Sequence, residues 1–153
     1  VQRQGFLSDA GALLLASTML RESDDGWQDT MNALAEYTSS FRREGRWIES
    51  GHADFQIVPA SGFDHPVPSS VSLAFMGLAR AAVLNGSQPE RLEYRQPHQS
   101  DFFNVAAMFS RGLFHQVHSR NGLAWPRLPA NSIQVRGAPE ADCYLGQCRP
   151  LAF

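Results

Sequence analysis

Two pairs of side chains in the C-terminal third carry the residue types best suited to chemistry. Cys143 and Cys148 are the two cysteines of the chain. Their C-x4-C spacing is looser than the C-x-x-C of redox centres, so we expect a disulfide or paired thiols that tether the tail. His115 and His118 are three residues apart, which on one helix face would suit a metal ion if a third ligand approached. No acidic residue shares that turn, so the sequence favours a surface pair, and we predict neither a metal site nor a cofactor.

The composition narrows the classes of function. The 153 residues are 43% hydrophobic and 18% charged, which is typical of one globular unit. The net charge is -2 with scattered basic residues, so nucleic acid is not an expected partner. All 13 basic residues are Arg, which excludes a lysine Schiff base. No apolar run reaches the roughly 20 residues of a membrane helix, and the start resembles no signal peptide. We therefore predict a cytoplasmic chain that begins inside a longer protein or follows a processing event.

The elements that must position these residues are mainly helical. Residues 8–20 and a second segment from Trp27 to about Gly45 have the apolar spacing of helices and are joined by a polar turn, which predicts a helical hairpin over residues 1–45. Residues 46–70 contain Trp47, an interruption at Ser50-Gly51-His52, and two prolines between residues 62 and 70, which favour an inserted strand hairpin followed by a loop. Ser69 or Ser70 is expected to cap the next helix.

A second helical hairpin is predicted over residues 71–125. Its first helix should stop at Asn85-Gly86, a left-handed C-terminal signal. Its second should begin at Ser100 or Asp101, with a buried stripe that continues through Leu113 to Val117. Residues 126–153 read as an irregular tail with one short strand over residues 132–136. The predicted fold class is therefore all-α, with short β insertions.

Three segments of the chain resemble one family. Gly5-Phe6-Leu7-Ser8-Asp9 is similar to a G-F-L-E-D-Y-A segment that opens a helix, and residues 64–72 are similar to a D-G-A-x-P-S-G-N-S loop before a helix. Residues 143–150 are similar to a C-x4-C-x-P tail. The order and spacing match the helical barrel of thioredoxin-domain-containing proteins related to spermatogenesis-associated proteins, within the N-acylglucosamine 2-epimerase and six-hairpin glycosidase-like superfamily. The chain departs from those motifs at Ser8, Ala10, Ser70 and Val71.

The resemblance implies a C-terminal piece of an (α/α) toroid with a central cavity for carbohydrate-like ligands. Four helices cannot close a ring of six hairpins, so it also implies a partner: the remainder of the barrel or another protein chain. At the matching motif positions, Asp9 and Asp64 become candidate acid and base groups. The structural alternatives are a first-turn Asp that complements the helix dipole for Asp9 and an Asx turn for Asp64.

Four further residues are candidates for binding a sugar in such a cavity. Trp47 and Phe55, in the inserted segment, have flat apolar rings that could stack on a pyranose. His52 and His65 lie in loops that could line the cavity, and one of them could act as a general base near neutral pH.

We therefore expect a subunit with a carbohydrate-type cavity, with epimerase-like or glycosidase-like chemistry completed by another chain or segment. The alternatives are a non-catalytic interaction subunit and a redox or metal-binding accessory segment.

Overall fold

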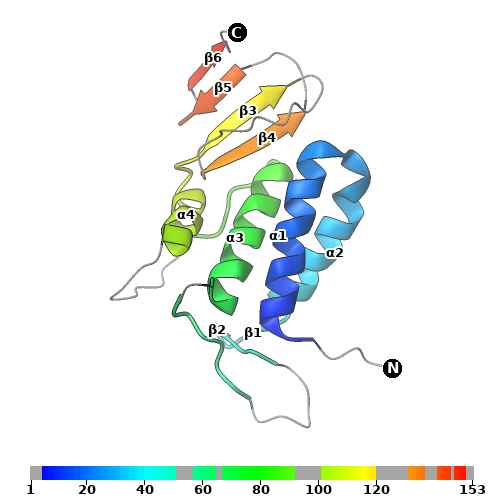
Figure 1. The fold of residues 1–153 in the computed structure, drawn as a ribbon, viewed down its shortest axis with the longest axis vertical. Coiled ribbons are helices and arrows are strands. Elements are labelled where there is room, and N and C mark those ends of the chain that lie inside the picture. Colours follow the sequence, from blue (N-terminus) through cyan, green and yellow to red (C-terminus); the bar gives the residue numbers. More distant parts are fainter. Residues whose placement is uncertain are drawn as a thin grey trace.

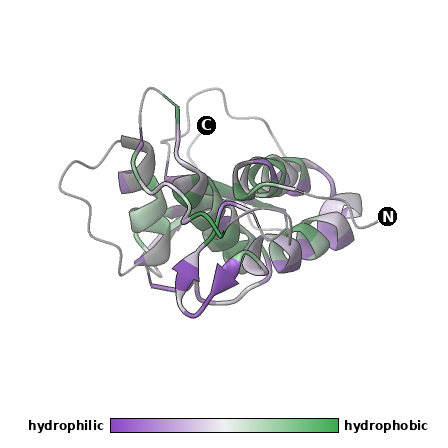
Figure 2. Ribbon diagram, turned by 90° about the horizontal axis from the view of Figure 1, so that it is seen from below, coloured by the Kyte–Doolittle hydropathy of each residue, from purple (hydrophilic) through white to green (hydrophobic). Residues whose placement is uncertain are grey.

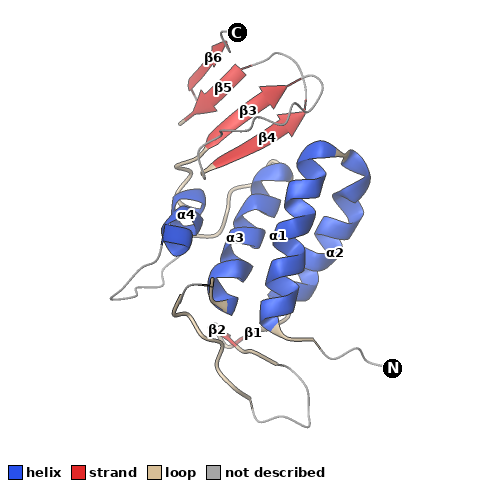
Figure 3. Cartoon of the chain, in the orientation of Figure 1, coloured by secondary structure: helices blue, strands red, loops and turns tan. Residues whose placement is uncertain are grey.

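The computed structural model of the chain describes residues 5–50, 57–64, 67–91, 101–119, 131–136, 141–145 and 147–150. Its helices form one layer, and a sheet of four strands lies across one end of that layer (Figures 1 and 3). The molecule is therefore a mixed α/β fold. The all-α prediction, and with it the incomplete (α/α) toroid, is wrong.

The first helical hairpin is formed as predicted. Helix α1 spans Leu7–Ser23 and α2 spans Gln28–Ser39, with a 3₁₀ turn, η1, at Asp25–Trp27 between them. The Asp24 carboxylate accepts a hydrogen bond from the Gly26 amide (2.9 Å), which caps the turn. Helix α2 ends before Gly45 because the chain reverses there into a short hairpin, β1 (Arg42–Arg43) and β2 (Arg46–Trp47).

Helix α3, Ser70–Leu84, is the centre of the helical layer. Its start confirms the predicted cap, because the Ser69 hydroxyl accepts a hydrogen bond from the Ser72 amide (3.2 Å). No residue of α3 is fully exposed. It packs directly on α1, where a Cβ on Gly11 would lie 2.8 Å from the Ala74 nitrogen. This close contact buries small residues of both helices, among them Ala10, Ser17, Ala74 and Ala81.

The fourth helix is shorter than predicted. Helix α4 spans Asp101–Ser110, and the chain then leaves it through Gly112, whose φ is 73°. The Leu113 amide donates to the Met108 carbonyl (2.8 Å), which closes the helix end. Residues expected to continue the helix form strand β3, His115–Ser119. The Val117 side chain is buried as predicted, but it belongs to strand β3 and not to a helix.

The tail, for which one strand was predicted, supplies three strands among its described residues. Strand β4, Ser132–Arg136, confirms the predicted strand and pairs parallel with β3. Strands β5, Ala141–Tyr144, and β6, Gln147–Pro150, follow as an antiparallel hairpin, so that the order across the sheet is β4-β3-β5-β6. The strands have only four or five residues each, and the sequence pattern indicated only β4. The other strands form because segments that are distant in the sequence pair with one another.

The main core lies between the helices and one face of the sheet. It joins α3, α4 and β4 through seven buried side chains: Met76, Ala79, Val83, Ala106, Phe109, Phe114 and Ile133. Phe109 and Phe114 stack with their ring centroids 5.1 Å apart. Figure 2 shows the hydrophobic colour gathered between the helices and the hydrophilic β1–β2 hairpin on the outside. Among the described residues, none of the helices is long and apolar enough to cross a membrane.

Candidate functional site

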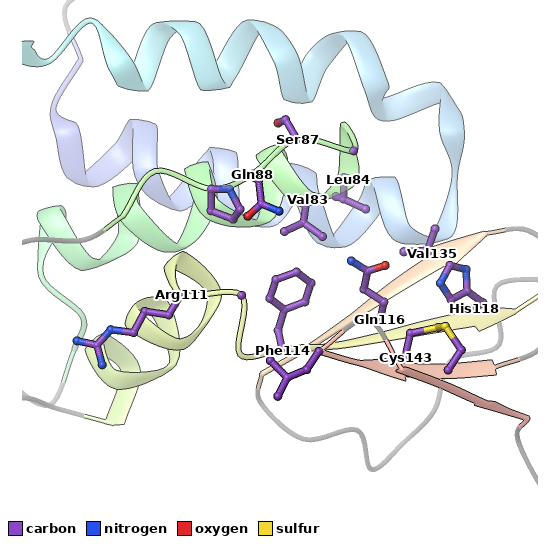
Figure 4. Close-up of a pocket in the computed structure, with 15 residues that line it drawn as sticks. Val83, Leu84, Ser87, Gln88, Arg111, Phe114, Gln116, His118, Val135 and Cys143 are labelled. Atoms are coloured by element: carbon purple, nitrogen blue, oxygen red, sulfur yellow. A yellow bond between two sulfur atoms is a disulfide. The ribbon is translucent and has the colours of Figure 1, made fainter.

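A cavity of about 740 Å³ opens where the C-terminal ends of α3 and α4 meet the sheet (Figure 4). Its volume lies within the range typical of small-molecule sites. The wall combines helix ends, the following turns and one sheet face: Val83, Leu84, Gly86, Ser87, Gln88, Pro89, Arg111, Gly112, Phe114, Gln116, His118, Val135, Cys143, Leu145 and Cys148.

Two helix ends of the same kind frame the mouth of the cavity. Gly86 after α3 and Gly112 after α4 both have positive φ, 69° and 73°. The Ser87 amide donates to the Ala82 carbonyl of α3 (2.8 Å), and the Leu113 amide donates to the Met108 carbonyl of α4 (2.8 Å). These bonds satisfy the last carbonyls of the helices and turn the chain sharply. The space in front of both turns is left open, since a Cβ on either glycine would meet no atom within 4 Å.

The sheet wall is set by strand register. Gln116 on β3 pairs with Cys143 on β5, which pairs with Cys148 on β6. Directly paired residues share a face, so these three side chains point to the same side as His118 and Val135. Cys143 and Cys148 form a disulfide across β5 and β6. The sheet therefore presents an amide, an imidazole and a disulfide to the cavity.

The polar groups of the cavity are mainly uncharged hydrogen-bonding groups. Gln88 and Gln116 face the same space beside the Phe114 ring, whereas the Arg111 guanidinium points away (Figure 4). No Asp or Glu is among the described residues that line it. An amide can both donate and accept hydrogen bonds. The arrangement suits an uncharged ligand with hydroxyl or amide groups and an apolar face.

Asp9 and Asp64 lie at the other end of the helical layer. The α1–α3 contacts run in parallel, with Gly11 beside Ala74 and Thr18 beside Arg80. The N-terminal ends of both helices are therefore remote from the cavity. Asp9 is exposed in the first turn of α1. Asp64 is buried, and its carboxylate accepts a hydrogen bond from the Ser69 amide (2.7 Å). Such a contact holds the loop that begins α3.

Trp47, which was also predicted to bind a sugar, is not at this cavity. Trp47 packs edge-on against Phe75, with ring centroids 5.6 Å apart, and the Arg42 guanidinium lies 5.7 Å from the Trp47 ring centroid. This tryptophan covers the core near the α1 and α3 N-termini. His52, Phe55 and His65 lie outside the described residues.

His115 and His118 do not share a face. They lie on strand β3, where residues three apart point to opposite sides of the sheet. His118 lines the cavity. On the other side His115 Nδ1 lies 3.0 Å from an Asp142 oxygen, and its ring stacks on Tyr144 with centroids 4.5 Å apart. Within the described part of the chain, no cluster of three or more potential metal ligands occurs.

Sequence reasoning missed the cavity residues Gln88, Gln116 and Phe114. Glutamine carries no motif, and Phe114 was assigned to a helix that does not reach it. The one usable signal was Gly112, which interrupts the helical pattern of α4 and would have indicated a change to a strand.

Comparisons with known proteins add no assignment. No protein-family model matches the chain, and neither a curated protein nor a solved structure matches it. The function is therefore argued from the cavity itself.

Proposed function

We propose that the chain is a binding module whose cavity holds a small, uncharged, hydroxyl-rich ligand of the carbohydrate class. The observation that carries this proposal is the pairing of two side-chain amides, Gln88 and Gln116, with the Phe114 ring in a wall whose described residues include no carboxylate. Amides hydrogen-bond sugar hydroxyls in both directions, and apolar surface packs against the C–H faces of a sugar ring.

Two further observations bear on the ligand class. His118 adds a third hydrogen-bonding group on the sheet wall. The three family-like segments, whose relationship to the epimerase and glycosidase superfamily we retain as a proposal, support the same ligand class. The observed fold is not the (α/α) toroid that this relationship implies, so the proposal depends mainly on the cavity.

The proposed activity is binding and not glycoside hydrolysis. Hydrolysis in most families needs two carboxylates a few ångströms apart. Asp9 and Asp64 lie at the far end of the helices, and Asp64 holds the loop before α3. We therefore propose no catalytic role for either residue at this cavity.

The experiment is a calorimetric titration of the full chain with neutral mono- and disaccharides and with the corresponding sugar acids. We expect a neutral sugar to bind and its acid to bind more weakly. Gln116→Leu should reduce affinity at least tenfold, because it removes the paired donor and acceptor from the wall. Gln134→Leu is the matched control, since Gln134 lies on neighbouring strand β4 but on the opposite face. Equal affinities in the two variants would exclude the cavity as the binding site.

The outer face of α1 supports a second candidate function, an interaction subunit. Leu13, Met19 and Leu20 are 57%, 54% and 42% exposed, and Ala12 and Ala16 complete the stripe. A helix that is apolar on both faces is normally covered on both. The occupant we propose is an apolar helix of another protein chain, which agrees with the partner predicted from the sequence.

The triple variant Leu13→Gln, Met19→Gln, Leu20→Gln tests this second function. It should abolish co-purification of a stoichiometric partner from the native source without lowering the stability of the isolated chain. A wild-type chain that is purified alone and binds no apolar dye would contradict it. The cytoplasmic location predicted from the sequence remains part of the proposal.

A further inference from the structure

The disulfide joins the edge strand β6 to its neighbour β5. Strand β6 is the last strand in the order and pairs with β5. All four of its residues, Cys148 among them, are exposed, whereas Cys143 is only 8% exposed. One sulfur of the bond is therefore carried by an exposed edge strand, and the other by a buried position.

From this asymmetry we infer that the Cys143–Cys148 disulfide is a thiol-reactive site, opened by dithiol reductants through attack at Cys148 while the rest of the molecule stays folded. Thiol exchange requires access of a thiolate to one sulfur. Strand β6 gives that access at Cys148. Opening the bond releases β6, and with it part of the cavity wall.

The exchange reaction proceeds in two steps. A thiolate of the reductant attacks the Cys148 sulfur, the Cys143–Cys148 bond breaks, and Cys143 leaves as a thiolate that takes a proton from water. The second thiolate of the reductant then displaces Cys148 from the mixed disulfide. The reductant ends as a disulfide, and the protein gains two electrons and two protons.

The fold can survive this reaction because its core does not depend on β6. The three buried clusters are built from α1 to α4, the segment around Phe41 and Ile48, Phe114 and β4. The bond closes a short loop, with a sequence separation of five residues. Short loops restrict the unfolded chain least, so the bond contributes less to global stability through chain entropy than a disulfide between distant segments would. Reduction should therefore loosen one edge and leave the helices in place.

Single-cysteine variants test which sulfur is accessible. In Cys143→Ser the remaining Cys148 thiol should react with a thiol-specific reagent at least tenfold faster than the Cys143 thiol does in Cys148→Ser. In the wild-type chain, glutathione should form a mixed disulfide that peptide mass spectrometry assigns to Cys148. Equal labelling rates, or a mixed disulfide on Cys143, would overturn the proposed direction of attack.

Hydrogen exchange tests whether opening is local. With a dithiol, we expect exchange to increase in residues 141–150 and to stay unchanged in α1 and α3. Reduction should also proceed at the same rate in a variant that unfolds faster, such as Arg80→Met, as in the wild type. A reduction rate that follows global unfolding would show that the bond is a buried structural link and would overturn the inference.

Discussion

Arg80 of α3 and Glu22 of α1 form a buried ion pair beside strand β4. Arg80 also donates to the Thr18 hydroxyl and to the Ser132 carbonyl, both at 3.1 Å. Glu22 accepts the Gln134 amide at 2.9 Å. Burial lowers the pKa of Arg80 to about 10, so the guanidinium stays charged at neutral pH. The pair thus joins both central helices to β4.

Removing one member of this pair should be costly. Arg80→Met leaves Glu22 as an unpaired buried charge, and we expect a loss of about 3–5 kcal/mol in the free energy of unfolding, measured with urea. Arg21→Met is the matched control, because Arg21 pairs with the exposed Asp25 on the surface of α1, where such pairs contribute about 1 kcal/mol or less. Similar losses in both variants would mean that the Arg80 pair is effectively solvated. The double variant Arg80→Met, Glu22→Met should regain part of the loss, since no unpaired charge remains.

The contact between α1 and α3 should not tolerate a methyl group. In Gly11→Ala the new Cβ would lie 2.8 Å from the Ala74 nitrogen and 3.0 Å from the Leu73 carbonyl carbon. Both are main-chain atoms, so the helices must separate, and we expect a destabilisation of roughly 1–3 kcal/mol despite the better helix propensity of Ala. Ser23→Ala, at the exposed end of α1, is the control and should leave the urea midpoint nearly unchanged. A Gly11→Ala chain as stable as wild type would show that the two helices are less tightly packed than described.

Asp64 should behave as a structural residue. Asp64→Ala deprives the buried Ser69 amide of its acceptor, which we expect to cost about 1–3 kcal/mol of stability. The ligand affinity of the folded chain should not change, because Asp64 is remote from the cavity. The comparison variant Asp9→Ala, at an exposed position, should change stability by less than about 0.5 kcal/mol. Loss of binding or turnover in a folded Asp64→Ala chain would restore the acid/base role predicted from the sequence.

Local chemistry determines which features could be predicted. The cap at Ser69 and the stop at Gly86 depend on a few adjacent residues, and both were predicted from the sequence. The sheet depends on pairing β3 with β4 and β5, segments separated by many residues. Val117 fits a helical stripe as well as a strand, so its assignment needs the tertiary partners. The error in fold class begins where the predicted helix was continued past Ser110 to Val117.

The positions of the candidate residues also depend on the topology. Placing His115 and His118 on a helix put both on one face, whereas a strand separates them and turns only His118 toward the cavity. Asp9 and Asp64 were paired because both precede helices. They do lie at one end of the helical layer, but the cavity forms at the other, where Gly86 and Gly112 end their helices. Which ends meet the sheet is a property of the topology and not of any motif.

Ligand affinity should depend on the redox state of the chain. Leu145 and Cys148 both line the cavity from the β5–β6 hairpin, so reduction removes apolar wall while Gln116 and Phe114 stay in place. A loss of about 1–2 kcal/mol of binding free energy would weaken binding roughly tenfold. Calorimetry with and without a dithiol measures this change. The double variant Cys143→Ser, Cys148→Ser should bind as weakly as the reduced chain and should not respond to the reductant, which separates release of β6 from any direct effect of the dithiol. If the oxidised chain binds a sugar and the reduced chain binds it equally well, the cavity is a binding site but β6 is not part of its working wall.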